Sequence, residues 1–136
     1  MAHIIKAERL DVCTIIDLMY DCNDKYNLGM EYSTRLQDTL QSFIEASRIH
    51  LLVEDDIVVG YVILNTYTTL FDKYELGIIS MYITEKYSYL IRTLLEFIKE
   101  QAEILEVQNI RISTDLGFID ERLMQLLTLN GYKTIG

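Results

Sequence analysis

Long apolar runs and low-complexity stretches are both missing from this sequence of 136 residues. No apolar run approaches the ~20 residues that a membrane-spanning helix needs, and residues 1–6 lack the apolar stretch of a secretory signal. We therefore expect a cytoplasmic protein with no membrane partner. An apolar content of 50%, with aromatic residues spread along the chain, argues against disorder.

Cysteine and histidine are scarce, with two of each. Cys13 and Cys22 lie nine residues apart in one expected helix, on nearly opposite faces, so they should stay reduced. His3 and His50 stand apart from each other and from both cysteines, without the short ligand spacings of a zinc site. The sequence predicts no metal site.

Basic residues are outnumbered by acidic ones, 12 to 21, which gives a formal charge of −9. This charge repels a phosphate backbone, so we expect no nucleic-acid partner. The negative charge suits a protein partner with basic patches. The alternative is that it only keeps a small domain in solution. The length fits a single domain over residues 1–136 with one continuous core.

Strand-like and helix-like periodicities alternate along the chain. Apolar β-branched runs predict strands, and apolar residues at spacings of three and four predict helices. In chain order we expect a strand at 3–7, helices through 12–22 and 36–44, strands at 49–54, 57–67 and 76–83, a helix at 88–106, a strand at 109–114, a helix through 123–127 and a last strand from Tyr132.

Short polar signals predict where these elements begin and end. Asp55 and Asp56 suit a tight turn between antiparallel strands, and Asn130-Gly131 is a common helix stop. The run 76–83 is too uniformly apolar to have one face in water, which predicts a central strand. The expected helix N-caps are Asp11, either Ser33 or Thr34, and Asp120.

This order of elements resembles the GNAT (acyl-CoA N-acyltransferase) superfamily over nearly the whole chain. Residues 81–87, MYITEKY, followed by a long amphipathic helix, are similar to the family's central strand and cofactor-binding helix. Residues 126–133, LLTLNGYK, are similar to its late helix and Gly-aromatic-basic turn. The resemblance implies an α/β fold with a mixed, mostly antiparallel central sheet flanked by helices.

In that family a Q/R-x-x-G-x-G/A loop offers backbone N–H groups to the pyrophosphate of acetyl-CoA, and glycine lets the backbone approach closely. Here Ser88, Ile91 and Thr93 fall at the three defining positions, and residues 78–116 contain no glycine. We therefore expect acetyl-CoA to bind weakly or not at all. If the cofactor does bind, the resemblance places it against Met81, Ile83, Ser88, Ile91, Arg92 and Thr93.

The resemblance also implies a base that deprotonates the amine and an acid that protonates the leaving thiolate. Residues 76–83 carry no acid, so Glu75 and Glu85, which flank them, are the candidate bases. The alternative is that both are exposed surface carboxylates, which we favour. The family's late-helix tyrosine falls on Leu127 in this sequence.

Three tyrosines near the expected cofactor site offer a replacement acid. Tyr87 is the candidate, and Tyr82 and Tyr89 are its neighbours. Packing is the alternative role for all three, because tyrosine suits a half-buried strand edge or helix start.

Two functions follow from the resemblance. The first is a GNAT-fold protein with a degraded acetyl-CoA loop that acts in interaction or assembly, with a protein partner or as a homo-oligomer. Small chains of this kind resemble bacteriophage-encoded proteins, which would place this one in the host cytoplasm or the virion. The second is an active N-acetyltransferase that transfers acetyl from acetyl-CoA to an amine.

The expected last strand, residues 132–135, is short and should leave backbone groups unpaired at the edge of the sheet. We expect a second copy or another protein to cover this edge, and a frayed tail is the alternative. Hydrogen exchange should therefore be slower at Lys133, Thr134 and Ile135 in the assembled state than in the isolated protein. Free exchange at these amides in both states would contradict the expectation.

Overall fold

The structure is a computed structural model that describes residues 1–29, 31–68, 70, 74–107, 109–112 and 120–135. The elements are β1 (His3–Lys6), η1 (Arg9–Asp11), α1 (Val12–Lys25), α2 (Leu36–Glu45), β2 (Ile49–Glu54), β3 (Ile57–Thr68), β4 (Tyr74–Ile83), η2 (Glu85–Leu90), α3 (Ile91–Leu105), β5 (Asn109–Ile112), α4 (Glu121–Leu129) and β6 (Lys133–Ile135), where η marks a 3₁₀-helix.

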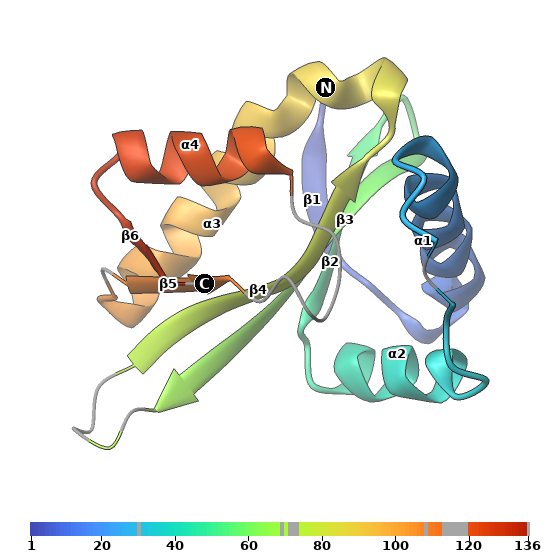
Figure 1. Ribbon diagram of the computed structural model, residues 1–136, viewed down its shortest axis with the longest axis horizontal. Coiled ribbons are helices and arrows are strands. Elements are labelled where there is room, and N and C mark those ends of the chain that lie inside the picture. Colours follow the sequence, from blue (N-terminus) through green and yellow to red (C-terminus); the bar gives the residue numbers. More distant parts are fainter. Residues whose placement is uncertain (30, 69, 71–73, 108, 113–119, 136) are drawn as a thin grey trace.

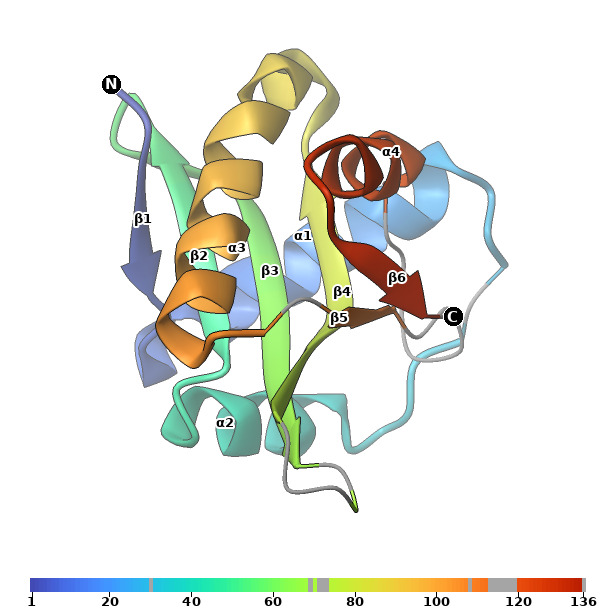
Figure 2. The ribbon, with the colours of Figure 1, turned by 90° about the vertical axis from the view of Figure 1, so that its left-hand side faces the viewer.

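The strands form one sheet in the order β1-β2-β3-β4-β5-β6. Pairs from β1 to β4 are antiparallel, whereas β4–β5 and β5–β6 are parallel. Helices α1 and α2 lie on one face, and α3 and α4 lie on the other (Figures 1 and 2). The expected mixed, mostly antiparallel α/β fold is confirmed.

The turn between β2 and β3 follows the prediction. Asp55 and Asp56 connect the two strands and have φ angles of 55° and 59°. Two consecutive residues at positive φ define the type I′ turn, whose twist matches that of an antiparallel hairpin.

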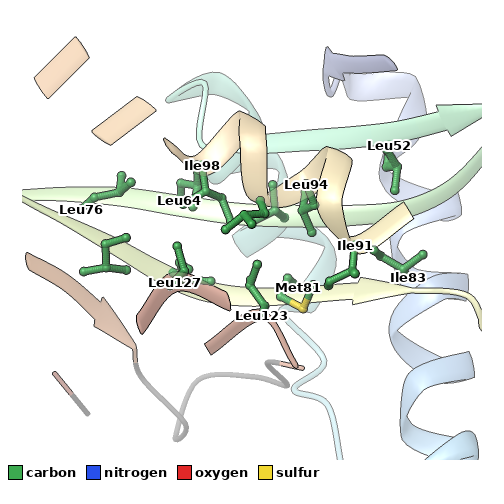
Figure 3. Packing of buried hydrophobic residues seen from close by; sticks show 14 of the residues in the cluster. Leu52, Leu64, Leu76, Met81, Ile83, Ile91, Leu94, Ile98, Leu123 and Leu127 are labelled. Carbon is green, nitrogen blue, oxygen red and sulfur yellow. The ribbon is translucent and has the colours of Figure 1, made fainter. Parts of the chain in front are cut away.

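Strand β4 is central, as its uniform apolar sequence predicts. Every residue from Glu75 to Ile83 is buried. The β3–β4 register shifts between Ile63 and Leu64, which pair with Ser80 and Ile78, so Ile79 is an extra residue on β4. Such a bulge reverses the side-chain alternation. It lets Leu76, Ile78, Met81 and Ile83 all face α3 and α4 (Figure 3).

The helix expected at 88–106 is two elements. Residues 85–90 form the 3₁₀-helix η2, inside which Tyr87 has the non-helical angles φ −109° and ψ 16°. The α-helix itself begins at Ile91 and buries the expected apolar stripe, Ile91, Leu94, Leu95, Ile98 and Ala102. Because residues 85–90 form a 3₁₀-helix, the side chains and backbone N–H groups at the start of the expected helix lie in other positions than a continuous α-helix would give them.

The predicted caps are confirmed in part. Asp120 accepts a hydrogen bond from the N–H of Arg122, and α4 ends at Leu129 with Asn130 as its C-cap and Gly131 at φ 89°. Asp11 precedes α1 as expected, but its carboxylate accepts from the N–H of Glu8 at 2.7 Å instead of capping α1. Helix α2 begins at Leu36 with Arg35 as its N-cap, and the hydroxyl oxygen of Ser33 accepts a hydrogen bond from the N–H of Arg35 at 3.0 Å.

Three smaller expectations also have an outcome. Cys13 is exposed and Cys22 is buried, and both are free thiols. Strand β5 ends at Ile112, and residues 113 and 114 of the expected strand lie outside the described residues. Within the described part of the chain, no helix has the length and apolar character needed to cross a bilayer.

A substitution at Gly60 tests the tight approach of β3 to β4. A Cβ atom at this position would stand 2.6 Å from the carbonyl oxygen of Tyr82. Because backbone must move to admit it, we expect Gly60→Ala to lower the free energy of unfolding by about 1–3 kcal/mol, measured by urea denaturation. A change within about 0.5 kcal/mol, the usual range for neutral surface substitutions, would contradict this packing.

Candidate functional site

Strands β4 and β5 pair over a short distance and then diverge. Leu76 to Ile78 pair with Ile110 to Ile112, and β4 continues to Ile83 with no described strand beside it on the β5 side. The gap leaves backbone N–H and C=O groups of β4 without a described strand partner. Because an open sheet binds ligands where neighbouring strands part, this splay is the candidate site.

The start of α4 is attached to β4 at the splay. The N–H of Asp120 donates to the sulfur of Met81 at 3.2 Å. Met81 is completely buried, and Ile83 is 5% exposed. Both side chains lie in the cluster under α3 and α4 (Figure 3). Only the backbone of these two expected cofactor residues is left to meet a ligand.

A cavity of about 590 Å³ lies beside the splay, between the end of α1, η2 and the start of α4. Of the residues predicted for the site, Glu85 and Ser88 line it. Its wall mixes charges of both signs. The other lining residues are Lys25, Tyr26, Asp120, Glu121 and Arg122.

The arginine of this cavity is already engaged. Arg122 Nη2 lies 2.6 Å from Asp120 Oδ2. Burial raises the pKa of the Asp120 carboxyl, but hydrogen bonds from the Arg122 side chain and backbone outweigh it and leave the pKa below its ordinary value. The same side-chain hydrogen bond raises the pKa of Arg122. This ion pair holds the N-terminus of α4 and leaves two of the three described wall carboxylates, Glu85 and Glu121, outside it.

Segment η2 does not form an open row of amides. The N–H of Tyr87 donates to the Thr84 carbonyl at 2.9 Å, and the N–H of Ile91 donates to the Ser88 carbonyl. These are i to i+3 bonds of a 3₁₀-helix, which use up donors that an anion would need.

The other expected cofactor residues point elsewhere. Ile91 is 9% exposed and packs in the core, where Figure 3 shows it beside Ile83. Thr93 borders a shallow hollow with Ile4 and Phe97 on another side of α3. Arg92 is exposed. Their roles as cofactor ligands stay predictions without support from this arrangement.

The candidate bases lie at opposite ends of β4. Glu85 is exposed and lines the cavity, as a surface carboxylate should. Glu75 is 8% exposed and accepts from Arg111 Nη2 at 3.0 Å, so the expectation of an exposed carboxylate is wrong there. The eight steps from Glu75 to Ile83 span about 26 Å of extended strand. One site therefore cannot use both carboxylates.

The three tyrosines differ in their surroundings. Tyr87 is half-buried and packs against the apolar cluster between the sheet and helices α3 and α4. The centre of its ring lies 6.3 Å from that of the Tyr89 ring. Packing is confirmed for Tyr82 and Tyr87, whereas Tyr89 is 66% exposed and does not fit that expectation. Tyr87 is near Glu85 in the chain but is not part of the cavity wall as described.

A contact that the sequence did not reveal joins Tyr82 to α1. Its hydroxyl donates to Asp21 Oδ2 at 2.6 Å, and its ring lies 6.4 Å from that of Tyr26. Burial, and then the hydrogen bond to Asp21, raise the pKa of Tyr82, which keeps the hydroxyl protonated. The two partners are 61 residues apart, so no local pattern could have paired them.

Comparison with known proteins gives the fold a family context. The sequence matches no protein-family model, and no curated protein is similar to it by sequence. Among solved structures, a possible acetyltransferase from Clostridium difficile 630 superposes with a TM-score of 0.74 at 19% identity, over 98% of this chain and 91% of that one.

Two further structures agree. A GNAT family acetyltransferase from Listeria monocytogenes 4b F2365 has a TM-score of 0.68 at 17% identity, over 99% of this chain and 88% of that one. The chain has the GNAT acetyltransferase fold. A predicted acetyltransferase from Clostridium acetobutylicum, solved with acetyl-CoA, has a TM-score of 0.66 at 12% identity, over 98% of this chain and 90% of that one. At these identities the likeness establishes the fold alone.

The Tyr82–Asp21 bond can be tested by removing the hydroxyl. We expect Tyr82→Phe to lower the free energy of unfolding by about 1–2 kcal/mol, because the bond is made to a charged but exposed acceptor. Tyr89→Phe is the matched control, since Tyr89 is exposed, and it should change nothing measurable. Equal stability of both variants in urea denaturation would show that the bond contributes nothing.

Proposed function

We propose that this chain is a GNAT-fold protein without efficient acetyl transfer that acts by binding another protein. The observation that carries the proposal is the closed conformation of η2, in which the N–H of Tyr87 is bonded to the carbonyl of the N-cap Thr84 and the N–H of Ile91, the first residue of α3, is bonded to the Ser88 carbonyl. A pyrophosphate needs several free N–H groups and a backbone that it can approach. These hydrogen bonds would have to break before the same N–H groups could bind a cofactor.

The charges of the cavity support the same conclusion. Glu85, Asp120 and Glu121 face a space in which Arg122 is neutralised by Asp120. Besides the Arg122–Asp120 pair, the described lining residues would offer the phosphates of coenzyme A two carboxylates and one cation, Lys25. Like charges repel within about 10 Å at ordinary ionic strength. The cavity suits a cationic or neutral group better than a polyanion.

A partner with basic patches fits this surface best. The chain has a formal charge of −9, and complementary charge speeds association and excludes wrong partners. Exposed tyrosines such as Tyr20 and Tyr89 add the residue type that is enriched at protein interfaces. Assembly of a bacteriophage particle, or interference with a host protein, is the setting that we propose for such contacts.

Acetyl transfer to an amine is the second candidate. The fold neighbours include acetyltransferases, and one of them was solved with acetyl-CoA. In this alternative Glu85, on the cavity wall, is the base and Tyr87 is the acid. Removing a true general base should lower the rate by ~10²–10⁴.

Calorimetric titration of the pure protein with acetyl-CoA tests the proposal. We expect affinity weaker than micromolar, which corresponds to a binding free energy less favourable than about −8 kcal/mol. Micromolar or tighter binding would overturn the proposal.

Two variants make this test sharper. Glu85→Gln removes one carboxylate from the cavity, and Glu100→Gln, on the exposed side of α3, is the matched control. If acetyl transfer occurs, turnover should fall in Glu85→Gln and stay normal in Glu100→Gln. Turnover that depends on Glu85 would establish the second candidate in place of the first.

A further inference from the structure

A second cavity, of about 300 Å³, lies at the other end of α3. It is bounded by the last turn of α3, the start of β2 and the middle of β3. Helix α3 has 15 residues, so its two ends are about 22 Å apart. This cavity is therefore separate from the one at the splay, and nothing in the proposed function uses it.

The floor and rim of this cavity are apolar. Leu64 and Leu76, from the paired strands β3 and β4, are 5% and 2% exposed and form its floor. Leu105 and Ile104 come from α3, and Ile104 is 74% exposed. A large apolar side chain left in water at a rim gains free energy when a ligand covers it. An apolar tail would thus have a place to bind.

Polar side chains without partners line the rest of the wall. Thr66 and Gln101 face the cavity, and their side chains form no hydrogen bond with any described residue. His50 also lines it, with Nδ1 buried and without a hydrogen-bond partner. Burial, and then the charge of Lys6, lower the pKa of His50, so the imidazole is neutral at pH 7. Unused donors and acceptors gathered around one space are typical of a ligand site.

Arg48 is the only formally charged residue on the described wall. It forms no ion pair with a described carboxylate, and its guanidinium carbon lies 5.7 Å from the centre of the Phe43 ring. Among the described residues that line the cavity there is no aspartate or glutamate, although the chain contains 21 of them. A guanidinium with unused N–H groups matches the geometry of a carboxylate.

The C-terminal ends of α2 and α3 also meet at this cavity, and helix C-termini carry partial negative charge. Both ends are closed, however. The N–H groups of Ser47 and Arg48 bond the carbonyls of Ile44 and Phe43. In α3 the amides of residues 106 and 107 do the same for the carbonyls of residues 103 and 102. Carbonyls that already accept such hydrogen bonds attract cations less. The positive charge of Arg48 therefore outweighs the partial negative charge of the two helix ends at this cavity.

We propose that this cavity binds a small organic carboxylate with a short apolar tail. Arg48 binds the carboxylate, Gln101, Thr66 and His50 supply the neighbouring hydrogen bonds, and the tail lies between the leucine floor and Ile104. The volume is at the lower end of the range for ligand pockets, which fits an acid of roughly six to ten non-hydrogen atoms. The inference goes beyond the proposed function and does not depend on it.

The test is an NMR titration of the full-length ¹⁵N-labelled protein with hexanoate. We expect saturable shifts centred on the amides of Arg48, His50, Thr66 and Gln101. Hexanamide, which is neutral, should bind at least tenfold more weakly, and hexylamine should not bind. Butanoate should bind more weakly than hexanoate, by at most about fourfold per methylene removed.

Variants separate the role of Arg48 from general charge. Arg48→Gln should weaken hexanoate binding by at least tenfold, the lower range for a hydrogen bond to a charged group. Arg35→Gln is the matched control, because Arg35 is exposed at the other end of α2, and it should bind as the unaltered protein does. If Arg48→Gln does not fold, the comparison of hexanoate with hexanamide on the unaltered protein decides.

Three results would overturn the inference. They are no saturable shift at about 10 mM hexanoate, equal binding of hexanoate and hexanamide, and shifts centred on Lys25 and Arg122 at the other cavity. A failed acetyl-CoA titration leaves this result unaffected, because the two experiments report on different ends of α3.

Discussion

Burial of β4 on both faces is the constraint on which the other elements depend. Leu76, Ile78, Met81 and Ile83 require a cover on one face, which α3 and α4 provide, and Ile79 and Tyr82 require another, which α1 and α2 provide. Each fully buried side chain of this size contributes about 1.5–3 kcal/mol. The extra residue Ile79 makes this arrangement possible, because it brings apolar residues to the α3 face in both halves of the strand.

Strand β4 also forms the candidate site, at the point where its pairing with β5 ends. Beyond Ile78, β4 has no described partner on the β5 side, and the first residues of α4 approach it instead, through the Asp120 N–H and the Met81 sulfur. A ligand at the splay would thus meet the N-terminus of α4 and segment η2. In this chain the first holds an internal ion pair, and the second is a 3₁₀-helix in which the N–H of Tyr87 is bonded to the Thr84 carbonyl.

The cavity at the splay and the cavity near Arg48 differ in the charge of their described lining residues. Three of the residues described on the wall at the splay are carboxylates, whereas none of those described near Arg48 is. Among the described lining residues, an arginine without an ion pair and without a neighbouring acid is what distinguishes the cavity near Arg48 from the rest of an acidic surface, as the proposed binding of a carboxylate requires.

Local patterns in the sequence determined the elements. The uniform run at 76–83 predicted the central strand, Asp55-Asp56 the hairpin turn, and Asp120 the cap of α4, because each depends on neighbouring residues alone. The glycine-free segment also predicted an unusual loop, but not its form, which is the 3₁₀-helix at residues 85–90. Tertiary structure alone decided the rest. Burial of Glu75 by Arg111, the bond from Tyr82 to Asp21 and the second cavity all join residues far apart in the chain, and no periodicity encodes such contacts.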